Sequence, residues 1–192
     1  MMKEKEWVNS IIPRVREDVD NELPGKFNIK VSTGYRLPYA YEVFEYEGEN
    51  PTGSKATTYE TDILLSEHKS DSTWVPRVIV ECKLSSITTH DAITYSTKSS
   101  THKNVHPYLR YGILLGNREH HPIPGRLIRH GAYFDFMVSW RGLEAEAFEW
   151  NGLIKVLSRE LRASQQLQEV FASHRSKNRK HYFILHRRLD LR

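Results

Sequence analysis

The sequence predicts an α/β fold in which a central mixed β-sheet is flanked by helices. Short runs of strand composition follow one another between residues 27 and 84, with turn residues between them. A polar helical segment, 85–104, separates the last of these runs from another at 108–115, which is the spacing of a parallel β-α-β step. Amphipathic patterns at 3–23 and 148–171 predict two further helices.

A single domain with a sizeable core is the organisation expected of 192 residues, and the segment 143–192, a helix followed by a basic strand, is predicted to be appended to that core. The net charge of +4 mildly favours a polyanionic partner. Cys82 is the single cysteine, which excludes an internal disulfide and fits a reducing cytoplasm. No apolar run approaches the length of a membrane span, so we expect a cytoplasmic protein without a membrane partner.

The first predicted helix, 3–23, has one apolar face formed by Trp7, Val8, Ile11, Ile12, Val15 and Val19. Pro13 falls inside this pattern and either kinks the helix or opens a second one. The pair at 24–25, Pro and Gly, ends the segment.

Strands follow this helix. Residues 27–35 alternate apolar with polar side chains, which is typical of a half-exposed strand, and 41–46 predict another. The composition of 49–54 predicts a turn. Strands at 58–65 and 76–84, joined by the polar connection 66–73, complete a meander.

The run from Val78 to Leu84 predicts a strand that is buried on both faces, yet it contains Glu81 and Lys83. Because side chains alternate along a strand, these two charged residues share one face, and Cys82 points to the other. Burying such groups costs several kcal/mol unless they are paired or bind a metal. The charges therefore indicate either a metal site or a structural ion pair.

Asp62 begins the apolar run 63–65 in the neighbouring predicted strand, so its carboxylate converges on that of Glu81. Two carboxylates on adjacent strands form an oxygen-rich site that suits a hard cation such as Mg²⁺. Lys83 beside them can orient a water or assist its deprotonation.

Asp62, followed by Glu81-Cys82-Lys83 at the end of an apolar strand, resembles the motif of the PD-(D/E)XK nuclease superfamily, which includes most type II restriction endonucleases and many repair and defence nucleases. The resemblance covers roughly residues 10–116 and concerns the order of elements and residue types. Thr61 stands where the family has a proline.

This resemblance implies a restriction endonuclease-like core and a Mg²⁺-dependent endonuclease in which Mn²⁺ can substitute. Asp62 and Glu81 would hold the metal with the Cys82 carbonyl oxygen, and Asp62, Glu81 and Lys83 would be catalytic. The implied partner is nucleic acid, in the first place double-stranded DNA. A nucleic-acid-binding module that has lost cleavage is the alternative function, and a homodimer is left open.

In several nucleases of this superfamily, a helix before the sheet adds one further carboxylate. Glu17, Asp18 and Glu22 are the candidates here, although for any one of them the sequence favours a solvated acidic helix edge. Glu67-His68-Lys69 also fits the acid-x-Lys pattern, but no apolar run precedes it, so we expect its charges to be solvated.

The helix predicted at 85–104 begins with a Thr88-x-x-Asp91 capping signature. Its hydroxyl-rich surface faces solvent or a ligand. Because this helix directly follows Lys83, we expect phosphate contacts from it; the candidates are Lys98, His102 and Lys103. An exposed polar helix without a ligand is the alternative.

After the strand at 108–115, residues 116–129 read as a basic loop, and 133–140 predict another strand. The chain ends in a basic segment before a short strand at 182–185, which indicates binding to a phosphate backbone or, alternatively, a solubilising tail. The candidate phosphate ligands in it are Arg175, Lys177, Arg179 and Lys180.

Other chemistries lack their sequence signals. The chain has no glycine-rich phosphate-binding motif and no G-x-S-x-G nucleophile motif. His102 and His106 have the spacing of zinc ligands on a helix, but the glutamate of H-E-x-x-H is missing and Pro107 follows, so we do not expect a zinc site.

Overall fold

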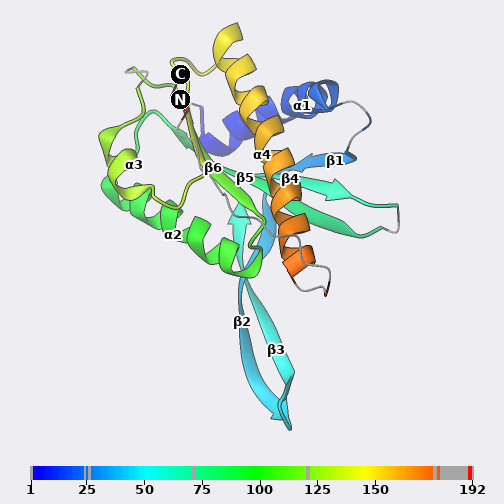
Figure 1. Cartoon of the computed structure of the whole chain (residues 1–192). Helices are drawn as coiled ribbons and strands as arrows, with labels where there is room; N and C mark the ends of the chain where they lie inside the picture. Colours follow the sequence, from blue (N-terminus) through cyan, green and yellow to red (C-terminus); the bar gives the residue numbers. More distant parts are fainter. Residues whose placement is uncertain are drawn as a thin grey trace.

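In the part of the chain that the structure describes, the elements are a mixed five-stranded sheet, a separate two-stranded hairpin and four helices (Figure 1). The computed structural model describes residues 2–23, 25, 27–70, 72–119, 122–174, 177 and 190–191. The elements in chain order are α1 (Glu4–Glu22), β1 (Ile29–Ser32), β2 (Tyr35–Glu47), β3 (Asn50–Thr61), β4 (Ile63–His68), β5 (Trp74–Leu84), α2 (Thr89–Val105), β6 (Arg110–Gly116), α3 (Gly125–His130), β7 (Phe136–Ser139) and α4 (Ala147–His174).

The sheet has the strand order β1-β4-β5-β6-β7. Strands β1, β4 and β5 pair antiparallel, whereas β5, β6 and β7 pair parallel. This arrangement confirms the predicted α/β fold with a mixed sheet, and the step from β5 through α2 to β6 is parallel as expected.

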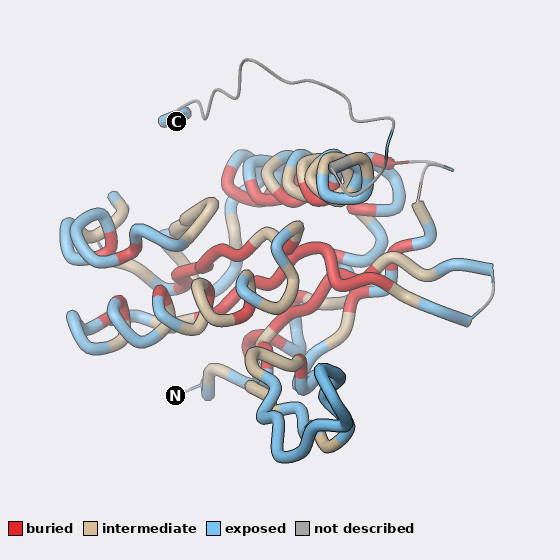
Figure 2. The backbone as a smooth tube through the Cα atoms, turned by 60° about the horizontal axis from the view of Figure 1, so that its bottom comes forward, coloured by how far each residue is buried: buried red, intermediate tan, exposed pale blue. Residues whose placement is uncertain are grey.

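Helices cover the two faces of the sheet. On one face, α1 and α4 pack on the side chains of Val78, Val80 and Cys82 in β5. On the other face, α2 and α3 contribute Ala92 and Leu127 to a smaller cluster over β6. Figure 2 shows the buried strands in the middle of the molecule. The alternation predicted for β5 is therefore correct, and Glu81 lies on the face opposite Cys82.

Two helices follow their local sequence signals. α1 runs unbroken through Pro13 and buries five residues of the predicted apolar face: Trp7, Val8, Ile11, Val15 and Val19. α2 begins after Thr88, whose hydroxyl accepts a hydrogen bond from the Asp91 amide at 3.0 Å, so the predicted cap is formed.

The β2–β3 hairpin differs from the sequence expectation. The run 58–65 is not one strand, because β3 ends before Asp62 and β4 begins after it. The chain reverses at Gly48 and Glu49, where Gly48 has a φ of +61°, and not across 49–54, most of which lies in β3. The hairpin projects away from the sheet (Figure 1), and most of its outer residues are exposed.

Three further expectations change. Residues 66–68 extend β4 and are not part of a polar connection, and the expected loop 116–129 contains the start of α3. In α2, Ser96 and Ser99 are buried instead of facing solvent or a ligand. The strand expected at 182–185 lies outside the described residues. None of the helices that the structure describes combines the length and apolarity that a membrane crossing needs.

Candidate metal centre

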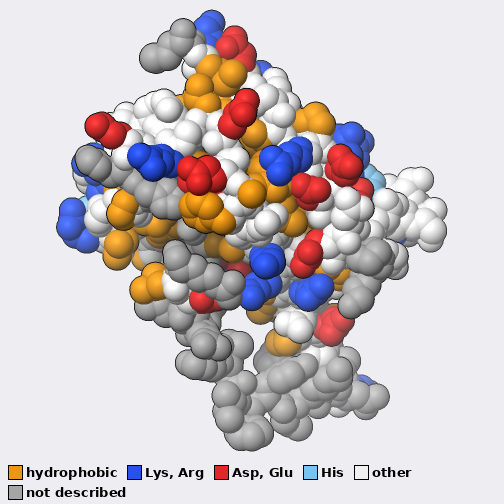
Figure 3. Space-filling view, turned by 90° about the horizontal axis from the view of Figure 1, so that it is seen from above, with side chains coloured by type: hydrophobic (Ala, Val, Ile, Leu, Met, Phe, Trp, Pro, Cys, Tyr) orange, Lys and Arg blue, Asp and Glu red, His pale blue; other side chains and the backbone are white. Residues whose placement is uncertain are grey.

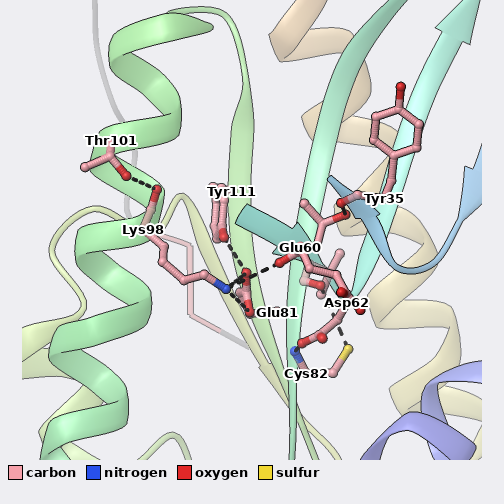
Figure 4. A network of polar contacts seen from close by, with 10 residues as sticks. Tyr35, Glu60, Asp62, Glu81, Cys82, Lys98, Thr101 and Tyr111 are labelled. Atoms are coloured by element: carbon pink, nitrogen blue, oxygen red, sulfur yellow. Dashed lines mark hydrogen bonds and ion pairs between the residues drawn. The ribbon is translucent and has the colours of Figure 1, made fainter. Parts of the chain in front are cut away.

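Asp62 and Glu81 meet where the hairpin leaves the sheet. Asp62 is the single residue between β3 and β4, and Glu81 lies near the end of the adjacent strand β5. The Cys82 backbone N–H donates a hydrogen bond to Asp62 Oδ2 at 2.8 Å (Figure 4). Because the N–H and C=O of a strand residue point to the same side, the Cys82 carbonyl also faces the Asp62 side of β5.

Glu81 is 2% exposed and receives hydrogen bonds from two neighbouring elements. Lys98 Nζ, from α2, lies 3.2 Å from Oε1 and 3.4 Å from Oε2 of Glu81 (Figure 4). The Tyr111 hydroxyl, from β6, also donates to Glu81 Oε1. Tyr111 had no place in the sequence-based site, because nothing local marks it as polar rather than as a core aromatic.

The two carboxyl groups hold protons more tightly than ordinary acids. Burial raises the pKa of Glu81 to about 7, and the neighbouring charge of Asp62 adds to the rise, although Lys98 opposes it. Burial also raises the pKa of Asp62, against the Cys82 amide and the two lysines, Lys83 and Lys98. Ionising both groups therefore creates an electrostatic demand for a cation.

Lys83 lies at the edge of this carboxylate pair and contacts other groups. Its Nζ is 3.8 Å from Glu4 Oε2 and lies over the ring of Tyr95 in α2, 5.3 Å from the centroid. Burial lowers the pKa of Lys83, but a hydrogen bond with Tyr95 and the charge of Glu4 outweigh it, so the pKa is raised. Within the described part of the chain, Glu81 pairs with Lys98, and the ion pair of Lys83 is with Glu4.

Glu4, in the first turn of α1, brings a third carboxylate to the neighbourhood. Burial raises its pKa, and the charge of Asp62 contributes to that rise. Glu17, Asp18 and Glu22 lie roughly 20 Å or more further along α1, at about 1.5 Å per residue. Asp18 instead accepts the indole N–H of Trp150 at 2.6 Å. The α1 carboxylate nearest the site is therefore one that the sequence analysis missed.

The donors present fit a magnesium ion. The described residues contain no cluster of three or more His, Cys, Asp or Glu side chains placed to hold a metal. Mg²⁺ commonly binds one or two carboxylates and completes its shell with water and substrate phosphate oxygens. Asp62, Glu81 and the Cys82 carbonyl match that requirement.

The three residues of α2 that were predicted to contact phosphate lie in different surroundings. Lys98 lies inside the site and is bound to Glu81. His102 is fully buried, and burial lowers its pKa to about 4, so a neutral, enclosed imidazole replaces the expected phosphate contact. Lys103 pairs with Asp135 at 2.8 Å.

The basic C-terminal segment adds little to the described surface. Lys177 is exposed. Arg175, Arg179 and Lys180 lie outside the described residues. On the face shown in Figure 3, the described basic and acidic side chains are interspersed, and they do not gather into a patch of one sign.

In the second acid-x-Lys triplet, Lys69 is exposed as expected, whereas Glu67 is not simply solvated. Glu67 Oε2 accepts a hydrogen bond from Arg77 Nε at 2.7 Å, and its other oxygen accepts from Gln165 at 3.1 Å. Glu67 thus has a structural partner, because β4 continues through it and places it beside β5.

Comparisons with known proteins found no match, so a function can be assigned only from the fold and the site. No model of a known protein family matches the chain, and a search of curated proteins finds no similar sequence. What the geometry defines is an α/β protein in which two neighbouring carboxylates, the buried Glu81 and the partly buried Asp62, are flanked by two lysines.

Proposed function

We propose that the chain is a Mg²⁺-dependent endonuclease that hydrolyses phosphodiester bonds of nucleic acid, with double-stranded DNA as the first substrate to test. The supporting observation is the partly buried carboxyl group of Asp62 beside the buried one of Glu81, where both groups have raised pKa values. Placing two carboxylates side by side in such an environment costs free energy, and the ion pair of Lys98 is with Glu81, so a divalent cation between the two would offset more of that cost. Two further points support the same proposal. The motif resembles that of PD-(D/E)XK nucleases, and the mixed sheet is compatible with a restriction endonuclease-like core.

Each residue has a distinct role in this proposal. Asp62, Glu81 and the Cys82 carbonyl hold the ion, which when bound polarises the phosphate and lowers the pKa of water. Tyr111 fixes Glu81 by hydrogen bonding to it. Lys83, held as a cation by Tyr95 and Glu4, orients the attacking water or stabilises charge on the phosphate.

Lys98 has a double role in the proposed centre. Without a divalent ion it neutralises Glu81, which offsets part of the cost of burying that carboxylate. Its ammonium also lies 5.4 Å from the ring centroid of Tyr95, the residue that contacts Lys83. Because Lys98 contacts Glu81 directly, its ammonium would be within reach of a substrate phosphate bound at this centre.

A cleavage assay tests the proposal. Plasmid, linear duplex and single-stranded substrates are incubated with Mg²⁺, Mn²⁺ or EDTA. We expect cutting with either metal, none with EDTA, and barely detectable cutting by Asp62→Asn or Glu81→Gln. Asp20→Asn, which changes an exposed carboxylate of α1, is the matched control and should cut normally. Cleavage by both site variants at the wild-type rate would refute the site.

Lys83→Ala separates catalysis from metal binding in the same assay. Because an ammonium does not ligate a cation, Mg²⁺ binding should persist while single-turnover cleavage slows by about 10³-fold, or about 4 kcal/mol. Lys155→Ala, an exposed lysine on α4, is the control. A lower melting temperature with normal activity in the folded fraction would assign Lys83 to structure. Binding of nucleic acid without cleavage by the wild type would favour the non-catalytic module.

A further inference from the structure

The outer part of the β2–β3 hairpin, residues 41–56, has large apolar side chains that stay exposed among the residues that the structure describes. Phe44 is 65% exposed and Tyr46 is 66% exposed, and Tyr41 and Val43 are also exposed. Figure 2 shows this segment, called the arm from here on, as an exposed ribbon outside the body. Two-stranded ribbons are marginally stable alone, and contiguous exposed apolar side chains mark an interaction surface.

The charge of the arm excludes nucleic acid as its partner. The arm contains four glutamates and one lysine, a net charge of −3, within a chain of net charge +4. The rest of the chain therefore carries +7, so the arm and the body have opposite signs. A phosphate backbone would be repelled by the arm, whereas a basic protein surface would attract it.

A surface with the matching properties lies on α2 and α3. Ile128 is 70% exposed and Tyr133 is 54% exposed, and Ile93, which is 47% exposed, lies on α2, the helix that packs against α3. Arg126 and Arg129 lie in α3, and residues 123–133 contain no acidic side chain. We call Ile93, Arg126, Ile128, Arg129 and Tyr133 the receiving face. Its apolar and basic side chains complement the aromatic, acidic arm.

The arm cannot reach the receiving face of its own chain. Figure 1 shows the hairpin pointing away from α3. The base of the hairpin is fixed against the end of α2, where the Pro38 carbonyl lies 3.1 Å from His102 Nδ1. The strands of the arm extend roughly 20 Å, at about 3.3 Å per residue. This length exceeds the radius of gyration of about 16 Å expected for a folded chain of this size. The arm is therefore long enough to cross onto a neighbouring body.

We propose that the arm docks on the receiving face of a second copy of this chain and forms a two-fold symmetric dimer. In such a dimer each protomer gives one arm and accepts one, so the same contact occurs twice. Phe44 and Tyr46 supply the apolar centre of each contact, and the glutamates of the arm meet Arg126 and Arg129 around it. This inference does not depend on the proposed nuclease activity.

Sedimentation equilibrium of the full chain tests the proposal. The wild type should reach twice the chain mass of 22.5 kDa. Phe44→Ser with Tyr46→Ser should raise the dissociation constant by about 100-fold or more, because aromatic anchors dominate such contacts. The melting temperature of the monomeric body should stay unchanged, since neither side chain packs in the core. Phe171→Ser, an exposed aromatic of α4, is the control and should leave the dimer intact.

A mixing experiment tests the pairing of arm with receiving face. Arg129→Glu should also yield monomers. Mixed with the Phe44→Ser, Tyr46→Ser variant, it should form a heterodimer, because one intact arm then meets one intact face. A wild type that stays monomeric at all concentrations overturns the proposal. So does a dimer that survives the arm substitutions, or two variants that fail to associate when mixed.

Discussion

Glu81 is the residue on which the proposed centre most depends, because burial disfavours the ionised form of its side chain. The side chain is 2% exposed, and the Lys98 ammonium and the Tyr111 hydroxyl donate hydrogen bonds to it from neighbouring elements. The charge of Asp62 next to it works against ionisation. A divalent cation would reverse that balance, because it attracts both carboxylates at once.

The raised pKa of Glu81 predicts how stability depends on pH without divalent ions. Between the ordinary pKa of 4.5 and about 7, Glu81 is protonated in the folded chain and ionised in the unfolded chain. Unfolding therefore releases a proton, so the free energy of unfolding should fall as pH rises through this window, by on the order of 3 kcal/mol. The loss is complete above the folded pKa.

Urea denaturation across this pH range, in the presence of EDTA, measures the effect. Glu81→Gln should remove most of the decline and be the more stable protein above pH 7, whereas Asp20→Asn should decline like the wild type. An identical pH slope in wild type and Glu81→Gln would show that Glu81 titrates normally.

The sequence analysis located Asp62, Glu81 and Lys83 because two-residue alternation and strand adjacency are local properties. It could not assign the partner of Glu81, because Lys98 and Tyr111 reach it only through the β5–α2–β6 crossover. Glu4 was missed for the same reason, since the first turn of α1 meets Leu84 only in the folded chain.

At the scale of elements, α4 is fixed to the sheet by a buried arginine. Arg77 of β5 is 4% exposed and donates hydrogen bonds to Glu67 and to Gln168 of α4, both at 2.7 Å. A guanidinium needs such partners when it is buried, because it cannot lose its proton. The contact joins β4, β5 and α4.

Removing Glu67 should therefore destabilise the fold. Glu67→Ala strands the buried Arg77 charge, and we expect the free energy of unfolding to fall by about 3 kcal/mol in urea denaturation. Lys69→Ala changes an exposed residue of the same triplet and should have little effect. Equal stability of the two variants would mean that Arg77 finds sufficient partners in α4 alone.

The sequence predicted the type of an element correctly where its apolar residues form a clear pattern, as in α1, β5 and α4. The hairpin was not, because Pro51 and Gly53 signal a turn and argue against a strand interior. They are tolerated in β3 because the hairpin has no third strand. A backbone N–H on the outer edge of β3 has no strand to bond with, so a residue without that N–H can stand there. Shifts in the β2–β3 register near Gly53 are consistent with this relaxed pairing.

At the scale of the whole molecule, the proposed centre lies at a junction. Asp62 is the point where the chain passes from the projecting hairpin into the sheet, and Glu81 is beside it on β5. The pairing of β4 with β5 and the parallel crossover from β5 to β6 followed from the sequence. The separation of β2 and β3 from the five-stranded sheet did not, since the sequence analysis placed the strand at 41–46 in the same meander. Nor did the sequence show which helices cover which face of the sheet. An apolar stripe indicates that one face of a helix is buried, but not which neighbour buries it.

Titration with Mn²⁺, followed by the loss of its free-ion electron paramagnetic resonance signal, tests the central claim that Asp62 and Glu81 hold a divalent cation. The wild type should bind the ion above pH 7 and more weakly below it, where a proton competes for Glu81. Asp62→Asn and Glu81→Gln should each lose that site, and Asp20→Asn should keep it. Equal Mn²⁺ binding by all four proteins would contradict the account.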